Sequence, residues 1–232
     1  KTFGKRLEQS GESGCRKKTC NNWFEVQDSI AYYAEFEKEK IVWGNLALDA
    51  QYALAEKGMF ASAPCPVITP GNKYILAVLN SKVADYFIRK LGVTRNGGYF
   101  EYKPMFVEKL PVPQISKEQQ KPFERLVDYI LFLKEKDIHP LFVSMFETVI
   151  NSLVYDLYFE EETKAHNLYV SDFVPKYLVS LKHEMTDDEK IQICEKMYRA
   201  LKNNDELTRA IINRNNSNLI KTIQGEADVA KN

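Results

Sequence analysis

The sequence predicts an α+β fold: an N-terminal mixed α/β domain with a small, mostly antiparallel sheet, followed by a C-terminal helical domain. Two observations support this division. Up to Pro113, short runs of β-favouring residues are separated by Gly and Pro, as strands are separated by turns. From Ser116 onward, apolar residues recur every three or four positions, which is the spacing of amphipathic helices. We therefore expect one domain over residues 1–113 and a helical spacer domain over residues 114–232.

The first domain is expected to contain several short strands. Residues 36–45 (FEKEKIVWGN) have a β-favouring Ile-Val-Trp centre, and residues 51–62 suggest a hairpin around a Glu-Lys-Gly turn. Prolines between residues 63 and 71 exclude a helix there, so this stretch should be an extended connection. The turn signal Asn-Gly-Gly at 96–98 precedes an alternating strand over residues 99–103.

One helix is expected in the first domain, from Asn72 to about Lys90. Asn72 is a favoured N-cap, apolar residues follow at helical spacing, and Gly92 is a helix terminator. Asn80 and Ser81 fall in the middle of this apolar helix, where a polar side chain without a hydrogen bond costs free energy. We expect both side chains to bond to a neighbouring strand or loop.

The second domain is expected to be a set of helices. The first opens with the capping box Ser-Lys-Glu-Gln, and Pro140 separates it from a nearly apolar helix that should form the buried spine. Thr186, followed by three acidic residues, opens a third helix. The asparagine-rich tail after Asn215 is expected to be loose. The four expected helices cover residues 116–136, 141–162, 186–203 and 206–213.

The composition is that of a folded, globular chain. Of the 232 residues, 44% are hydrophobic, and no apolar run approaches the ~20 residues of a membrane span, so no membrane partner is expected. The 32 basic and 32 acidic side chains cancel, which argues against a general polyanion binder. Residues 1–113 nevertheless hold 16 basic and 12 acidic side chains, a net +4, against 16 and 20, a net −4, in residues 114–232. The first domain is therefore the one expected to face an anion.

The four cysteines predict neither a disulfide framework nor a metal site, and they favour a reducing cytoplasm. Cys15 and Cys20 would need two further zinc ligands, and the three histidines are far away in the sequence. Cys65 and Cys194 lie among apolar residues, as inert core cysteines do. Because the first residue is Lys1 rather than methionine, we expect the chain to be a piece of a longer protein.

No motif in the sequence identifies a catalytic site. The phosphate-binding patterns G-x-x-x-x-G-K-[ST] and G-x-G-x-x-G and the nucleophile pattern G-x-S-x-G are absent. The acidic clusters at residues 160–162 and 187–189 fall at helix ends, where acidic groups complement the helix dipole. His139 precedes a proline at a helix break, and a structural role suits it better than catalysis. We expect no catalytic residue and no cofactor site in this chain.

The remaining signal is a group of basic residues interleaved with aromatic ones. Arg95 and Asn96 occupy a loop, where arginine can pair with the two acceptors of guanine and asparagine with the donor and acceptor of adenine. Lys82 and Arg89 are seven residues apart on the expected helix and so share one face. The same Arg-Asn-Gly-Gly phrase is also common turn chemistry, and scattered basic residues are ordinary surface. These residues alone leave both interpretations open.

Several phrases in the sequence together resemble the TaqI-like C-terminal specificity domain, the target-recognition domain of type IIG restriction-modification enzymes. Their order and spacing carry the resemblance, which covers about residues 20 to 160. The phrases are Asn22–Gln27 (NWFEVQ), Phe36–Trp43 (FEKEKIVW), Leu79–Lys82 (LNSK), Gly98–Phe100 (GYF) before Lys103, Leu110–Pro113 (LPVP) and Val154–Phe159 (VYDLYF).

This resemblance implies a module that recognises a specific sequence in double-stranded DNA for a prokaryotic, cytoplasmic enzyme. The parent enzyme would methylate adenine at N6 and cleave DNA nearby, using S-adenosylmethionine and Mg²⁺. The glycine-rich loop for S-adenosylmethionine and the Asn-Pro-Pro-Tyr signature are absent here. The methyltransferase and nuclease domains of the same chain would therefore precede Lys1.

The residues expected to contact DNA are chosen by their chemistry and position, because the reading residues of the family vary with the target. Successive residues of a strand point to opposite faces, so one of Tyr99 and Phe100 should belong to the core. The candidates for base reading are Arg95, Asn96 and Tyr99, and the candidates for phosphate contact are Lys82, Arg89, Lys90, Lys103, Lys17 and Lys18.

Two other functions fit the same sequence. The specificity subunit of a type I restriction system shares this kind of domain, although such a subunit normally carries two recognition halves and two long helices. A helical adaptor that docks a protein through its apolar faces would bind no DNA, and its binding would not weaken as salt rises.

Overall fold

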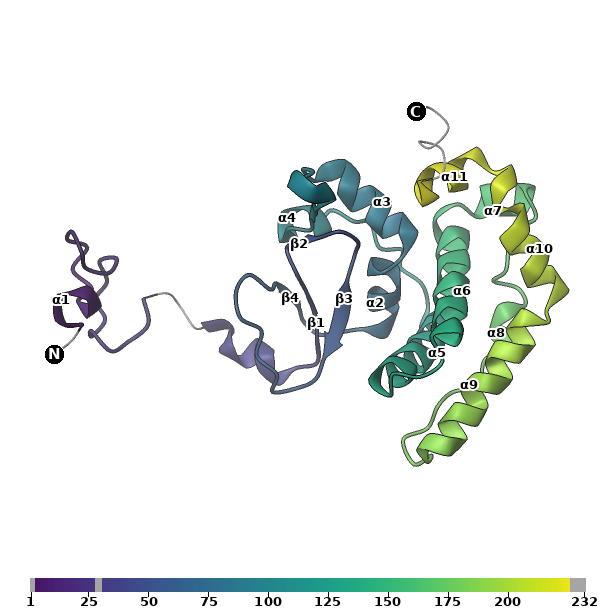
Figure 1. Cartoon of the computed structure of the whole chain (residues 1–232), viewed down its shortest axis with the longest axis horizontal. Helices are drawn as coiled ribbons and strands as arrows, with labels where there is room; N and C mark the ends of the chain where they lie inside the picture. The colour runs from purple at the N-terminus through teal and green to yellow at the C-terminus, as the bar shows by residue number, and fades with distance from the viewer. Residues whose placement is uncertain (1–2, 28–30, 226–232) are drawn as a thin grey trace.

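The structure is a computed structural model that describes residues 3–27 and 31–225. Figure 1 shows a small N-terminal segment, which contains helix α1 (Gly4–Leu7), apart from a main body in which a sheet-bearing part lies beside a helical part. The predicted α+β fold is confirmed, because small antiparallel sheets occupy the N-terminal half and helices the rest. The division into domains at residues 113 and 114 stays a prediction.

Five short strands build the sheets of residues 31–225: β1 (Lys40–Trp43), β2 (Leu46–Ala47), β3 (Tyr52–Ala55), β4 (Val67–Ile68) and β5 (Phe100–Glu101). The first sheet has three antiparallel strands in the order β3-β1-β4. Its centre is Ile41, which is fully buried and lies opposite Leu54 on one neighbour and Ile68 on the other. The second sheet pairs β2 with β5, also antiparallel.

Most of the predicted strands form, with shorter bounds. The strand expected over residues 36–45 begins only at Lys40, because Phe36 belongs to a 3-10 helix, η1 (Ala31–Glu37). The stretch over residues 63–71 contains no helix, as predicted, and is extended in part: β4 lies between a turn at 63–64 and a bend at 69–70. The strand expected over residues 99–103 is reduced to β5.

The hairpin expected over residues 51–62 is wrong. Its first arm is β3, but β3 pairs with β1 rather than with residues further along the chain. The rings of Trp43 and Tyr52, which are opposite each other on these strands, lie 5.4 Å apart between centroids. At the other end of the pair, the buried Lys40 Nζ donates to Glu56 O (2.7 Å) and holds the turn that follows β3. Burial against β1 therefore outweighs the local preference for a hairpin.

The single helix expected from Asn72 to Lys90 is also wrong, because two helices form there: α2 (Lys73–Leu79) and α3 (Lys82–Leu91). The break lies at Asn80 and Ser81. The Ser81 hydroxyl accepts a hydrogen bond from the backbone N of residue 84 (3.2 Å), so it caps a new helix instead of continuing the old one.

The Asn80 side chain connects the break between α2 and α3 to strand β3. Its Oδ1 accepts from Tyr52 N and its Nδ2 donates to Tyr52 O, both at 3.0 Å. The prediction that Asn80 bonds to a neighbouring strand is confirmed. The same prediction is wrong for Ser81, whose hydroxyl donates to Val78 O (2.6 Å) in the preceding helix.

The helical part is centred on two long helices, α5 (Lys117–Glu135) and α6 (Pro140–Tyr158). The predicted capping box of α5 is present, with Ser116 and Gln119 each bonded to the other's backbone N–H. Helix α6 is the predicted buried spine, with Phe146, Val149 and Val154 fully enclosed.

One hydrophobic core runs from the sheet-bearing part into the helical part. Helix α2 packs against α5, and the rings of Tyr74 and Phe123 lie 5.3 Å apart between centroids. Tyr74 Oη also donates to Pro113 O (2.8 Å), next to the expected domain boundary. The helical part is therefore a continuous support for the sheets.

Shorter helices complete the main body. The loose tail expected after Asn215 is wrong for residues up to 225, because Ile220 and Ile223 are buried in a final helix capped by Ser217. The predictions for residues 186–203 and 206–213 are confirmed as helices. The additional helices are α4 (Pro104–Val107), α7 (Glu160–Ala165), α8 (Val174–Tyr177), α9 (Asp187–Lys202), α10 (Asp205–Asn213) and α11 (Asn218–Gln224).

Candidate nucleic-acid interface

The loop between α3 and β5 carries the residues predicted to read bases. Its central turn is a short 3-10 helix, η2 (Asn96–Gly98), in which both glycines have a φ of 79°, a conformation that other residues adopt with strain. The turn is closed by Arg95 N, which donates to Tyr99 O (2.7 Å). The predicted turn is therefore confirmed, and it leaves Arg95, Asn96 and Tyr99 exposed.

An open pocket of about 510 Å³ lies beside this loop. One wall is the loop itself, another is the segment that joins β1 to β2, and the third is β5 with the residues that follow it. We call it the 94–103 pocket. It is lined by Asn45, Leu46, Thr94, Arg95, Asn96, Glu101 and Lys103.

The charge in this pocket is organised around one carboxylate, that of Glu101, whose side chain is only 7% exposed. Arg95 Nε donates to its Oε1 (2.6 Å), and Lys103 Nζ lies 2.9 Å from its Oε2. Hydrogen bonds from Lys103 and then Arg95 hold the pKa of Glu101 below its usual range. Two cations, Arg95 and Lys103, therefore pair with the single negative charge of Glu101. These three side chains together keep a net positive charge toward solvent.

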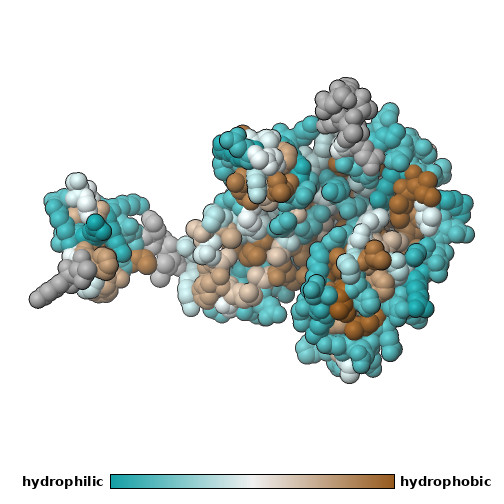
Figure 2. Space-filling view, in the orientation of Figure 1, coloured by the Kyte–Doolittle hydropathy of each residue, from teal (hydrophilic) through white to brown (hydrophobic). Residues whose placement is uncertain are grey.

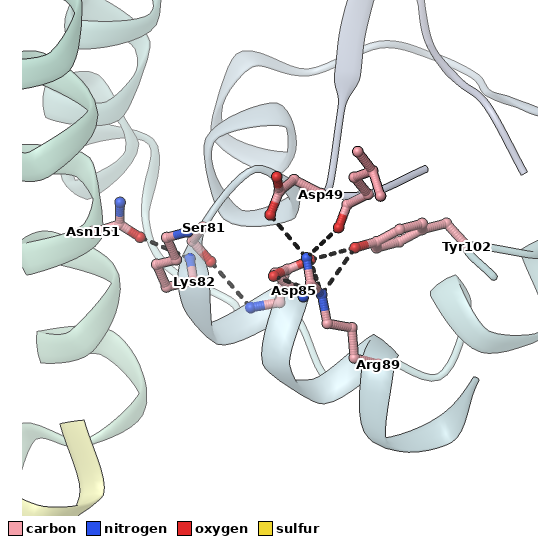
Figure 3. Close-up of polar contacts among 9 residues, drawn as sticks. Asp49, Ser81, Lys82, Asp85, Arg89, Tyr102 and Asn151 are labelled. Carbon is pink, nitrogen blue, oxygen red and sulfur yellow. Dashed lines mark hydrogen bonds and ion pairs between the residues drawn. The ribbon is translucent and has the colours of Figure 1, made fainter. Parts of the chain in front are cut away.

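Arg89, predicted to contact phosphate, is engaged instead in a polar cluster between α3 and the sheets (Figure 3). Its Nε donates to Asp85 Oδ1 (3.0 Å) and to Tyr102 Oη (3.2 Å). Its Nη2 donates to Leu48 O (2.7 Å) and to Asp49 Oδ1 (2.9 Å). Tyr102 Oη in turn donates to Asp85 (2.5 Å), and burial, followed by this carboxylate, raises the pKa of Tyr102.

These contacts give Arg89 a structural role. The guanidinium carbon lies 4.1 Å from the centre of the Phe100 ring, so the side chain also packs on β5. Phe100 faces inward and is partly buried, whereas Tyr99 is 40% exposed, which agrees with the expectation that one of the two belongs to the core. Arg89 therefore fixes β5, and thereby Glu101, relative to α3, and its contact with phosphate stays a prediction.

Of the other predicted phosphate contacts, Lys103 lines the 94–103 pocket, and the remaining four lie elsewhere. Lys82 opens α3 at the end away from the loop, where its backbone N donates to Asn151 Oδ1 (2.7 Å; Figure 3). Lys90 is exposed near the other end of α3, with Nζ 5.1 Å from the Tyr86 ring centre. Lys17 and Lys18 belong to the N-terminal segment, which Figure 1 shows apart from the main body.

Four residues that line this pocket, Asn45, Leu46, Thr94 and Glu101, are not among those predicted to contact DNA. Glu101 could have been recognised, because it is two residues from both Tyr99 and Lys103 on the predicted strand and so shares a face with them. It is also the acidic residue closest in sequence to both cations. Asn45 carries no such signal. It follows a strand and a glycine, as turn residues commonly do, and only the pairing of β2 with β5 brings it to the loop.

No metal site is found in the parts of the chain that the structure describes, since no three His, Cys, Asp or Glu residues there are placed to hold an ion. The cysteines are free thiols. Cys194 is buried, as expected, but the core position expected for Cys65 is wrong, because its residue is exposed. Among the described residues, no helix combines the length and apolar character needed to cross a membrane.

The surface near the pocket is not uniformly polar. Figure 2 shows apolar side chains reaching the surface in patches over the main body. Leu46, which lines the pocket, and the nearby Leu48 are both 51% exposed. The pocket thus offers cationic donors, amide groups and an apolar contact side by side, which is the chemistry that the edges of bases in a DNA groove require.

Comparison with known protein families agrees with this chemistry. Residues 4–112 match the model of the TaqI-like C-terminal specificity domain. A search of curated proteins gave no match. The sheet-bearing part with its pocket lies within the matched residues, and this part of the chain is a TaqI-like C-terminal specificity domain. It is therefore a DNA sequence-recognition module of a restriction-modification enzyme.

Proposed function

We propose that this module selects the double-stranded DNA target of an enzyme that methylates adenine at N6 and cleaves DNA nearby, as type IIG restriction-modification enzymes do. The observation that carries the proposal is the 94–103 pocket. It brings together three of the residues predicted to contact DNA, Arg95, Asn96 and Lys103, within the matched specificity domain. Base contacts here would set the sequence, and phosphate contacts by exposed lysines would set the register.

The geometry of Arg95 supports a role in base reading. Its guanidinium meets Glu101 through Nε and Nη2, so the outer edge with Nη1 remains for a second partner. That edge can donate to two acceptors at once, and guanine presents two in the major groove, O6 and N7. The side chain is 54% exposed, which leaves it accessible to a duplex. Glu101 holds the guanidinium in place and reduces the entropy lost on binding.

The catalytic groups of the parent enzyme are proposed to lie in methyltransferase and nuclease domains of the same polypeptide. S-adenosylmethionine would supply the methyl group there, and Mg²⁺ would assist cleavage. The residues of this chain do not fit either group, since the described parts contain no metal-binding cluster and the sequence has no glycine-rich loop for the cofactor. The role of this chain is to bind and orient the duplex.

Selection from a pool of random duplexes tests the proposal. The 232-residue chain should enrich a defined sequence, and the double variant Arg95→Ala, Asn96→Ala should lose the preference at one or more positions of that sequence. Arg199→Ala is the matched control, because Arg199 is also an exposed arginine paired with a glutamate, Glu195, but lies on α9. Enrichment of no sequence, or of an unchanged sequence by the double variant, would contradict the proposal.

A further inference from the structure

A second amide lies in the 94–103 pocket, that of Asn45, and its surroundings in the structure are unusual. Its Oδ1 is buried yet accepts no hydrogen bond within the described parts of the chain. A buried polar atom without a partner is uncommon, because it has lost its hydration without replacement. Because Asn45 itself lines an open pocket, a rotation of its side chain can bring this atom to a ligand that supplies the missing hydrogen bond.

The backbone of Asn45 is fixed while its side chain is not. Asn45 O accepts a hydrogen bond from Tyr102 N (2.8 Å), which fastens the segment between β1 and β2 to the end of β5. Tyr102 belongs to the Arg89 cluster and accepts from Arg89, so this attachment point is itself supported. The amide turns about a torsion with a broad energy profile. A rotation of the amide can therefore present its oxygen and nitrogen to the pocket without moving the backbone.

The neighbours of Asn45 indicate what the ligand is. Arg95 and Lys103 supply only donors, and the Glu101 oxygens are already occupied by these two cations. The Asn45 amide adds an acceptor next to a donor. Adenine presents the matching pair in the major groove, an N6 amino group that donates and an N7 that accepts.

We propose that Asn45 is a specificity-determining residue that reads adenine at one position of the target, beside the base read by Arg95. The inference rests on the proposed function. It adds to that function a residue that lies fifty positions before Arg95 in the sequence. The two amino acids line the same pocket, so the bases they read would be neighbours in the target.

The test is selection from random duplexes by the full 232-residue chain and its variants. Asn45→Ala should lose the preference at one adenine position, with discrimination there falling about ten-fold or more, and should keep the rest of the sequence. Asn45→Asp keeps the acceptor and loses the donor, so the preference at the same position should move from adenine to cytosine, whose N4 amino group donates. Asn215→Ala and Asn215→Asp, at an exposed asparagine of the helical part, are the matched controls.

The outcomes separate this inference from the proposed function. If the wild-type chain enriches a sequence and both Asn45 variants enrich it unchanged, the inference is overturned while the proposed function stands. If the wild-type chain enriches no sequence, both fail. Thermal unfolding of each variant accompanies the selection, and a uniform loss of preference at every position by the folded variants would also overturn the inference, because it would show a general effect on the module.

Discussion

At the scale of single residues, charged groups in this structure serve two different purposes that the sequence does not distinguish. Arg89 and Arg95 are six residues apart and both pair with a carboxylate. The guanidinium of Arg89 is enclosed by five contacts, whereas Arg95 is half exposed at the pocket. Exposure and the number of partners decide which arginine stabilises the fold and which remains available for a ligand.

Arg89→Ala should therefore destabilise the fold. The substitution leaves Asp85, whose side chain is 13% exposed, without its cation and removes hydrogen bonds to Leu48 and Tyr102. We expect a loss of about 2–3 kcal/mol in the free energy of unfolding. Urea denaturation followed by circular dichroism measures it. Arg199→Ala, which removes an exposed helical ion pair, should cost under about 0.5 kcal/mol, and an equal loss in the two variants would contradict the structural role of Arg89.

Asp156 should make the stability depend on pH between about 4 and 6. Burial raises the pKa of this carboxyl to about 6. Hydrogen bonds to Oδ2 from Val170 N, Ser171 N and Ser171 Oγ oppose this rise only in part. Oδ1 is buried and has no hydrogen-bond partner among the residues that the structure describes. The folded protein thus holds a proton that the unfolded chain, with a pKa of 3.8, releases earlier. Because the folded pKa is the higher one, this contribution is present below pH 4 and is lost as the pH rises through 6.

Comparison with Asp156→Asn isolates that contribution. Wild type should lose about 2.4 kcal/mol of stability through this group as the pH rises from 4 to 7, and the neutral variant should not. The measurement is the free energy of unfolding in urea at pH 4, 5, 6 and 7. Glu35, Glu101, Asp187 and Glu189 have lowered pKa values and act in the opposite direction in both proteins, so the difference between the two curves is the quantity to compare. Parallel curves would contradict the burial of a titrating Asp156.

At the scale of elements, local signals in the sequence predict where helices start, and contacts between distant residues decide where they break. The predicted capping box at the start of α5 and the predicted cap at Thr186, the start of α9, are both present, because a cap acts through bonds within four residues. The break between α2 and α3 was not predicted, although Ser81 is itself a good cap. What decides the break is the bond between Asn80 and β3, whose partner lies 28 residues away and has no local signature.

Asn80→Ala should loosen that junction. The variant loses the two hydrogen bonds to the backbone of Tyr52 and a third to Leu76 O (3.1 Å). Leaving part-buried backbone groups without partners should cost about 2 kcal/mol. Asn80→Asp, which retains the acceptor for Tyr52 N but not the donors, serves as the comparison. Hydrogen exchange at Tyr52 N should become faster in the alanine variant, and unchanged protection there would contradict the role of Asn80.

The candidate site shows the same limit of sequence reasoning. Arg95, Asn96 and Lys103 could be grouped from the sequence because one turn and one short strand connect them. Asn45 could not, because it reaches the pocket only through the pairing of Leu46 with Glu101. The hairpin expected at residues 51–62 failed for the related reason that β3 finds its partner earlier in the chain.

At the scale of the whole molecule, the helical part carries the recognition surface on a continuous core. Tyr74 of α2 packs on Phe123 of α5, and α3 contacts both α6 and α11. The pocket lies on β2, β5 and the loop after α3, and so its position is fixed through α3 by helices far along the chain. This arrangement agrees with a spacer that holds a recognition module in a fixed orientation.

The charge distribution of the whole molecule predicts how DNA binding depends on salt concentration. If about six phosphates are contacted by exposed cations, the logarithm of the DNA binding constant should fall with the logarithm of salt concentration with a slope near −5. Lys103→Ala should reduce the magnitude of the slope by about 0.9, because one phosphate contact is lost. Lys196→Ala, at an exposed lysine of α9, removes the same charge on the helical part and should leave the slope unchanged. Fluorescence anisotropy with a labelled duplex between about 50 and 200 mM salt gives the slopes. A slope near zero would instead favour an adaptor that docks a protein through apolar faces, whereas equal changes in both variants would show that the bound phosphates are not those near the 94–103 pocket.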